Sequence, residues 1–182
     1  MDTGPNDPPQ PAWHKWAARD QSWAQALHHS VERVLLLRAL IAVSWLSDGI
    51  LWVALVLLLP WFGGASGTAC ALRMVGLGAL NLFMYVTLKR HFARPRPFVS
   101  CKGVRQVARS LDEYSFPSGH TLHAVSFAIL LGSYYPALHW VLWPFAGLVA
   151  LSRVVLGLHY PSDVLVGVLI GAASARLVLM LF

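Results

Sequence analysis

Long apolar runs dominate the chain, and they follow neither an alternating nor a heptad pattern. The runs that can cross a bilayer cover about residues 48–61, 68–88, 118–135, 139–156 and 161–182. A single helical span needs about 20 mainly apolar residues. Short turns at 63–67, at Pro136 and at 157–160 separate neighbouring runs. The pattern therefore predicts an all-α membrane protein with a bundle of about five transmembrane helices.

The segment before the first span is more polar. Residues 13–30 mix Trp, Ala and Leu with basic side chains, which is typical of an amphipathic helix at the membrane interface. Residues 34–45 predict a helical lead-in to the span, and the sequence leaves open whether both form one tilted helix. We therefore expect three regions, which are a disordered tail at 1–12, interfacial and lead-in helices at 13–47, and a transmembrane core at 48–182.

Composition supports a membrane protein, and charge narrows its partners. The chain has 182 residues, of which 57% are hydrophobic and 12% are charged. Soluble domains carry about twice that charged fraction. The formal net charge of +6 gathers in the loop after Lys89. Such a loop suits nucleic acid, anionic headgroups or a phosphorylated substrate. Because lipid-embedded segments flank it, we expect the bilayer as a partner and no nucleic acid. Anionic headgroups and a phosphorylated substrate both stay as candidates for the basic loop.

Three polar clusters interrupt the apolar pattern. They are KRHFARPRP at 89–97, PSGH at 117–120 and SRVVLGLHYPSD at 152–163. In the five-span topology the clusters lie at the end of the second span, the start of the third, the end of the fourth and the start of the fifth. These ends share one membrane face, so we expect the clusters to form one pocket.

Five residues of this expected pocket have the charge or the hydrogen-bond donors that bind a phosphate group. Phosphoryl transfer needs cations and hydrogen-bond donors around the phosphate oxygens. Lys89, Arg96 and Arg153 supply positive charge. Ser118 and Gly119 stand at a helix start, where free backbone N–H groups and the helix dipole favour an anion. These five residues predict a phosphate-binding site.

Two histidines and one aspartate can supply the chemistry. One of His120 and His159 can attack phosphorus while the other protonates the leaving oxygen. Asp163 follows His159 by four residues and can accept a hydrogen bond from one ring nitrogen. The sequence has no carboxylate cluster for Mg²⁺ or Zn²⁺. We therefore expect no metal and no other cofactor, with the protein's own cations in their place.

The three clusters resemble the motifs KX6RP, PSGH and SRX5HX3D of the type 2 phosphatidic acid phosphatase (PAP2) family, which is related to the vanadium haloperoxidases. Every motif residue is present, in order and at the right spacing, across 89–163. The resemblance implies that His159 is the nucleophile of a phosphohistidine intermediate, that Asp163 orients it, and that His120 is the general acid. It implies phosphate binding by Lys89, Arg96, Ser118, Gly119 and Arg153. The spacing from Lys89 selects Arg96 over Arg94.

The resemblance also implies a substrate class and a location. The expected reaction is hydrolysis of a lipid phosphate or diphosphate, such as phosphatidate, phosphatidylglycerophosphate, undecaprenyl diphosphate or the 1-phosphate of lipid A. Family members usually face an extracytoplasmic space, which implies a bacterial inner membrane with the site toward the periplasm. The positive-inside rule would instead place the basic loop in the cytoplasm. The oligomeric state is not predicted.

The sequence leaves open some alternative functions and the roles of several residues outside the three motifs. The same intermediate could serve a lipid phosphotransferase, the pocket could hold vanadate in a haloperoxidase, and a phospholipid-binding membrane protein could lack catalysis. Asp48 either caps a span or contacts the active-site loops. Residues 112–114 form either a solvated loop or a headgroup selector. His123 follows His120 by one turn and could face the same cavity.

Overall fold

The computed structural model describes residues 12–31, 33–110 and 112–181, with side chains from Trp16 onward. The predicted tail lies outside this part except for Ala12, which begins the first helix. The described elements are all helical, namely α1 (Ala12–His29), α2 (Val34–Leu46), α3 (Ile50–Phe92), α4 (Pro97–Ser100), α5 (Gly119–Tyr134), the 3₁₀ turn η1 (Pro136–Leu138), α6 (His139–Val155) and α7 (Pro161–Leu181). The predicted all-α fold class is confirmed.

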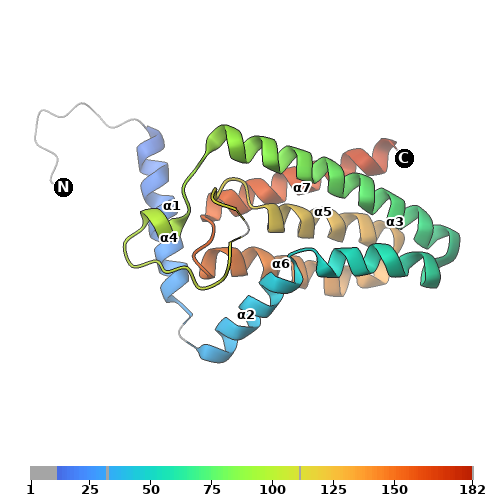
Figure 1. Ribbon diagram of the computed structural model, residues 1–182, viewed down its shortest axis with the longest axis horizontal. Helices are drawn as coiled ribbons and strands as arrows, with labels where there is room; N and C mark the ends of the chain where they lie inside the picture. Colours follow the sequence, from blue (N-terminus) through green and yellow to red (C-terminus); the bar gives the residue numbers. More distant parts are fainter. Residues whose placement is uncertain (1–11, 32, 111, 182) are drawn as a thin grey trace, which may run out of the picture.

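The long helix α3 reverses direction at Gly64. This residue has φ 55° and ψ −135°, a conformation that glycine tolerates because it has no Cβ. Close approach of the two arms also requires Gly67, where a Cβ would lie 2.0 Å from the carbonyl oxygen of Leu59. Figure 1 shows the teal first arm and the green second arm meeting at this reversal and diverging from it. The predicted turn at 63–67 is therefore confirmed.

The lead-in and the first span are separate helices. Helix α2 ends at Leu46 and α3 begins at Ile50. Between them Gly49 has φ 126°, a value that breaks a helix and suits glycine. Helix α2 then packs against α6. The question that the sequence left open is thus answered by a break immediately after Asp48.

The lengths of the apolar helices agree with a membrane protein. Three described stretches are long and apolar enough to cross a membrane, namely Ile50–Ser100, Pro136–Val155 and Pro161–Leu181. The first contains both arms of α3. Helix α5 has 16 residues, buries most of its side chains, and packs against α3, α6 and α7. Two arms and three helices correspond to the predicted five-span bundle.

Helices α5 and α7 approach each other through two glycines. A Cβ at Gly167 would lie 2.7 Å from the carbonyl oxygen of Ser118, and one at Gly171 would lie 2.5 Å from that of Leu122. Small residues let helix backbones pack closely in a membrane protein. The backbone N–H of Ser118 donates to the carbonyl oxygen of Asp163 at 3.0 Å. The starts of α5 and α7 are therefore held together.

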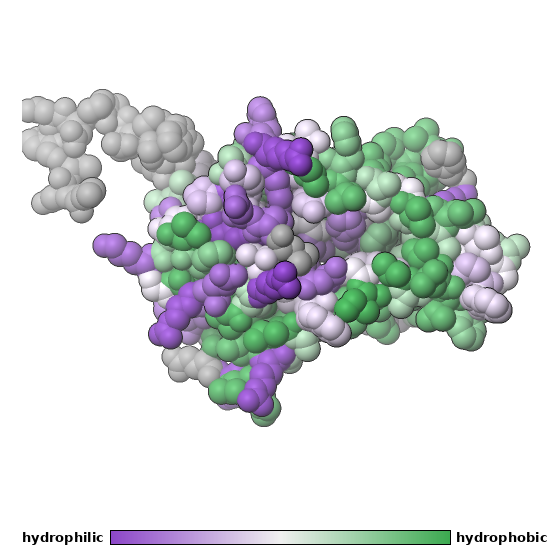
Figure 2. Space-filling model, viewed as in Figure 1, coloured by the Kyte–Doolittle hydropathy of each residue, from purple (hydrophilic) through white to green (hydrophobic). Residues whose placement is uncertain are grey.

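Polar groups gather at one end of the bundle. The end of α3, the start of α5, the end of α6 and the start of α7 lie there, beside α1 and α4 (Figure 1). Figure 2 shows hydrophilic residues over this end and hydrophobic residues over most of the remaining face. The three polar clusters are thus brought together as the sequence predicts.

Candidate active site

A cavity of about 180 Å³ opens at the polar end of the bundle. Five of the predicted site residues line it, namely Lys89, Arg96, Gly119, His120 and His159. The other three predicted residues are buried and do not line the cavity, namely Ser118, Arg153 and Asp163. The structure therefore brings the eight residues to one region, with five in the cavity lining and three buried behind it.

The ring of His159 has two hydrogen bonds of fixed polarity. Its Nδ1 lies 2.6 Å from the carbonyl oxygen of Ser115, and its Nε2 lies 3.2 Å from Nη1 of Arg96. A carbonyl can only accept and a guanidinium can only donate. The hydrogen-bond network therefore assigns the proton to Nδ1 and the lone pair to Nε2. This lone pair is the electron pair that a nucleophile needs.

The surroundings of His159 keep the ring neutral. Burial lowers its pKa well below the ordinary value, and the charges of Arg96 and Arg153 lower it further. Both effects disfavour an imidazolium ion. Nε2 therefore carries no proton at neutral pH, and its lone pair accepts the hydrogen bond from Arg96.

Asp163 differs from the expected arrangement. Its Oδ2 lies 3.8 Å from Nδ1 of His159, too far for a hydrogen bond. Its Oδ1 instead accepts from Nη1 of Arg94 at 2.7 Å, and its Oδ2 accepts from the backbone N–H of Tyr160 at 2.9 Å. The four-residue spacing suits two residues on one helix, but His159 precedes α7. The carbonyl of Ser115 takes the expected place of the carboxylate.

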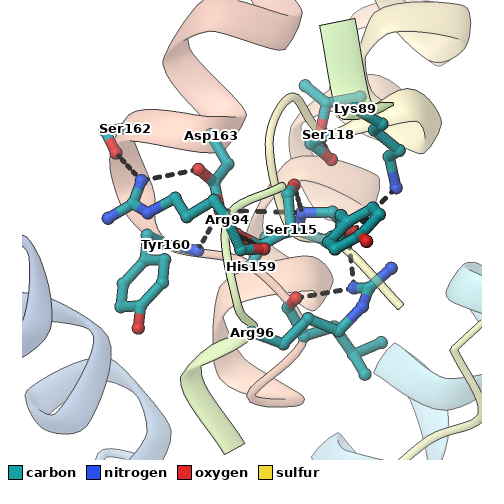
Figure 3. A network of polar contacts seen from close by, with 12 residues as sticks. Lys89, Arg94, Arg96, Ser115, Ser118, His159, Tyr160, Ser162 and Asp163 are labelled. Carbon is teal, nitrogen blue, oxygen red and sulfur yellow. Dashed lines mark hydrogen bonds and ion pairs between the residues drawn. The ribbon is translucent and has the colours of Figure 1, made fainter. Parts of the chain in front are cut away.

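Arg94 connects α1 to the start of α7. Its Nη2 donates to Asp20 of α1 at 2.7 Å, and its Nη1 donates to Oγ of Ser162 at 2.8 Å. The guanidinium also lies 3.9 Å from the ring centroid of Tyr160. Figure 3 shows Arg94 pointing toward Ser162 and Asp163, and Arg96 pointing away from them. Arg94 and Arg96 of the first cluster therefore have different partners.

Lys89 and Arg96 share a carboxylate. Nζ of Lys89 lies 2.6 Å from both carboxylate oxygens of Asp112, and Nη2 of Arg96 lies 2.8 Å from its Oδ1. Although burial raises the pKa of the Asp112 carboxyl, the hydrogen bond and charge of Lys89 and the charge of Arg96 outweigh that effect, so the pKa lies below its ordinary value. Asp112 is therefore ionised and belongs to the site, not to a purely solvated loop.

His120 and His123 both face the cavity. The Nε2 of His120 pairs with the carboxylate of Asp48, which stands in the break between α2 and α3. The Nδ1 of His123 lies 2.8 Å from the carbonyl oxygen of Gly119. Of the two interpretations of Asp48, the contact with the site is the one that the structure supports.

Arg153 and Ser118 lie behind the cavity wall. The Nη1 of Arg153 donates to Oγ of Ser44 in α2, and its Nε has no hydrogen-bond partner among the described atoms. The Oγ of Ser118 lies 2.9 Å from Oγ1 of Thr121 and makes no hydrogen bond to a backbone N–H. Arg153 therefore keeps hydrogen-bonding capacity next to the site, whereas the Ser118 hydroxyl is already engaged.

Sequence reasoning missed several of these contacts. Asp20 and Arg94 are separated by 74 positions, and Arg94 and Asp163 by 69. No local spacing can reveal such pairs. The one sequence signal was the second arginine in the first cluster, Arg94, which precedes a proline as Arg96 does. Ser115 acts through its backbone, so its side chain gave no signal.

Comparisons with known proteins agree with these motifs. The family model of the PAP2 superfamily matches residues 67–182. An undecaprenyl-diphosphatase of Bacillus subtilis is 32% identical over 113 residues, which cover 62% of this chain and 58% of the relative. The chain spans about half the length of several curated relatives that it matches.

Two solved structures resemble the fold. The crystal structure of Aquifex aeolicus LpxE has a TM-score of 0.76 and 27% identity, and the match covers 87% of this chain and 93% of that one. A transmembrane PAP2 type phosphatidylglycerolphosphate phosphatase from Bacillus subtilis has a TM-score of 0.74 and 24% identity, with 90% and 84% covered. The second likeness supports the fold alone.

Proposed function

The chain belongs to the PAP2 superfamily, and from this premise we propose that it is an integral membrane phosphatase that hydrolyses a phosphomonoester or a diphosphate of a lipid. The observation that carries the proposal is the state of His159. Its neutral ring presents the Nε2 lone pair next to Arg96, in a cavity that Lys89 also lines. A nucleophile and two phosphate-binding cations therefore meet in one place.

The proposed reaction has two steps. Nε2 of His159 attacks phosphorus, the bond from phosphorus to the leaving oxygen breaks, and His120 donates a proton to that oxygen. Water then attacks phosphorus and His120 takes a proton from the water. The bond from phosphorus to Nε2 breaks, its electron pair returns to His159, and phosphate leaves. Asp48 is positioned to orient His120, because it pairs with Nε2 of that ring. Asp163 would act on His159 through the α7 start and the Tyr160 backbone, since it makes no direct hydrogen bond to the ring.

Charge stabilisation falls to the protein's own cations. Lys89, Arg96 and Arg153 can balance the charge that spreads over the equatorial oxygens. The buried Nε of Arg153 is an available donor beside the site. In the described part of the chain, no group of three or more His, Cys, Asp or Glu residues could hold a metal ion. The proposed two-step reaction needs no metal ion.

The relatives suggest the substrate class and the location. Their names include an undecaprenyl-diphosphatase and a phosphatidylglycerolphosphate phosphatase. We therefore take undecaprenyl diphosphate and phosphatidylglycerophosphate as candidates, together with phosphatidate and the 1-phosphate of lipid A. The proposed location is a bacterial inner membrane with the polar end of the bundle toward the periplasm.

A substrate panel tests the proposal. Purified protein in detergent and excess EDTA would receive each of the four lipids, and release of inorganic phosphate would be measured. We expect release from at least one lipid and inhibition by vanadate. Release of inorganic phosphate also separates hydrolysis from transfer to another acceptor.

The variant His159→Ala should lower turnover by at least ~10³-fold, because the nucleophile is lost. His91→Ala, an exposed histidine that does not line the cavity, is the matched control and should leave turnover unchanged. Full turnover in His159→Ala, or a strict need for added divalent metal, would contradict the proposal.

A further inference from the structure

The phosphate-binding cations already hold an anion of the chain itself. Among the described residues, Asp112 is the one carboxylate that contacts both Lys89 and Arg96, at 2.6 and 2.8 Å. Both cations are buried, with 5% and 1% of their surface exposed. The carboxylate side chain is 33% exposed and lines the cavity. Asp112 therefore occupies donors of both cations in the lining of the same cavity.

A carboxylate and a phosphate compete for the same donors. Lysine and arginine bind either group through charge-assisted hydrogen bonds. Lys89 contacts both carboxylate oxygens of Asp112, and Arg96 contacts one of the same two atoms. A substrate phosphate that binds Lys89 and Arg96 must therefore take over these contacts. Because Asp112 lies on a loop and is partly exposed, its side chain has solvent to move into.

We propose that Asp112 is a specificity-determining residue that occupies the phosphate-binding cations until a more highly charged phosphate displaces it. The inference rests on the proposed function, since it concerns the same site. A phosphomonoester carries about −1.5 to −2 charges at pH 7 and offers three acceptor oxygens. A phosphodiester carries one charge and so gains little over the single charge of the carboxylate. Asp112 thus favours phosphomonoesters and terminal diphosphates over phosphodiesters.

The selection has a clear use in a bilayer. A site that faces a membrane meets phosphodiester headgroups far more often than lipid phosphomonoesters. Without an internal anion, Lys89 and Arg96 would attract every one of these headgroups. The lowered pKa of Asp112 keeps the carboxylate charged at neutral pH, so the competition persists under working conditions. The internal anion therefore excludes singly charged phosphodiesters more strongly than it excludes phosphomonoesters, which carry more charge.

A different role for Asp112 makes the opposite prediction. If the carboxylate only holds Lys89 and Arg96 in place, its removal should disorder the cations and weaken the binding of any phosphate. If it competes with phosphate, its removal should strengthen that binding. The sign of the change therefore decides between the two roles.

The experiment compares the full chain in detergent with EDTA as wild type, Asp112→Asn and Glu113→Gln. Glu113 is the neighbouring exposed carboxylate, so its variant removes the same charge beside the site. Inorganic vanadate binding is followed by the rise in the midpoint of thermal unfolding, which needs no turnover. A short-chain phosphatidylglycerol serves as the phosphodiester competitor against hydrolysis of a short-chain phosphatidate.

In Asp112→Asn we expect vanadate to act at a concentration at least ~10-fold lower, because one opposing charge is gone. The phosphodiester should inhibit this variant and leave the wild type and Glu113→Gln unaffected. Asp112→Glu keeps the charge, so it should require more vanadate than Asp112→Asn does, and its folding shows whether the loop tolerates substitution. Weaker vanadate binding in Asp112→Asn, or unchanged binding and no inhibition by the phosphodiester, overturns the proposal.

The outcome can be separated from that of the proposed function. A wild type that hydrolyses lipid phosphates while Asp112→Asn shows no shift contradicts only the role of Asp112. A wild type that binds vanadate with the expected shift in Asp112→Asn but hydrolyses none of the lipids contradicts the proposed function and leaves the internal anion in place.

Discussion

At the scale of single residues, the neutral state of His159 has a consequence for stability. The unfolded chain binds a proton on this ring below a pH of about 6.5, the ordinary histidine value. The folded ring resists protonation, because burial and then Arg96 and Arg153 lower its pKa. The contribution of His159 to stability is therefore present above the ordinary pKa and is lost as the pH falls.

We predict that the wild type loses more stability than His159→Gln when the pH is lowered from about 7.5 to about 5.5, because glutamine takes up no proton. Thermal unfolding in detergent at the two pH values measures this difference. The comparison between variants cancels the titration of the other histidines. Equal losses in both proteins would show that the folded ring is protonated as easily as the unfolded one.

The residue scale is also where sequence reasoning reached its limit. The motif spacing selected Lys89, Arg96, His120 and His159, and all four line the cavity. It could not anticipate that Asp112 contacts two cations across a loop, because a short acidic pair after a basic stretch is typical of a solvated segment. The spacing of Asp163 suggested a contact with His159 that the start of α7 prevents.

At the scale of helices, α5 depends on the glycines of α7. Gly171 leaves room for the carbonyl oxygen of Leu122, from which a Cβ would lie 2.5 Å away. The neighbouring atom is backbone, so it cannot rotate away as a side chain could. Because the same pair of helices carries Ser118 and Asp163 at its polar end, a separation here also reaches the site.

We predict that Gly171→Ala lowers the free energy of unfolding by ~1–3 kcal/mol, the usual cost of overpacking. Gly147→Ala in α6 is the matched control, since nothing lies within 4 Å of its Cβ position. Alanine there should be neutral or stabilise by roughly 0.5–1 kcal/mol, as expected inside a helix. Thermal midpoints of the two purified variants test this. Equal midpoints would mean that α5 and α7 can separate without cost.

The helices themselves were predictable because apolar length and turn residues are local signals. The turn at 63–67 and the ends of α5, α6 and α7 fell within a few residues of their predicted places. The break after Asp48 could not be predicted, because Ser47 and Asp48 are compatible with a helix. The helix is interrupted by the φ of 126° at Gly49.

At the scale of the whole molecule, the polar end and the reversal at Gly64 lie at opposite ends of the bundle (Figure 1). Both native cysteines, Cys70 and Cys101, are buried and free. The chain therefore offers a low background for labelling with a membrane-impermeant maleimide. Exposed positions exist at each end, with Arg105 in the basic loop and Ser66 beside the reversal.

We predict that Arg105→Cys reacts with the maleimide in intact bacterial cells and that Ser66→Cys reacts only after permeabilisation. The physical reason is the proposed orientation, which places the polar end outside the cytoplasm despite its positive charge. Mass-shift labelling on a gel measures both reactions. The reverse result would place the active site in the cytoplasm and restore the positive-inside rule for this loop.

The main-chain carbonyl of Ser115, which accepts a hydrogen bond from Nδ1–H of His159, has a consequence for mutational studies. Every replacement of Ser115, including proline, keeps the main-chain carbonyl. A mutational scan of the chain therefore cannot delete the group that fixes the tautomer of His159, the proposed nucleophile. Such a scan would measure only the effect of losing the Ser115 hydroxyl. It would not report the effect of the carbonyl on His159.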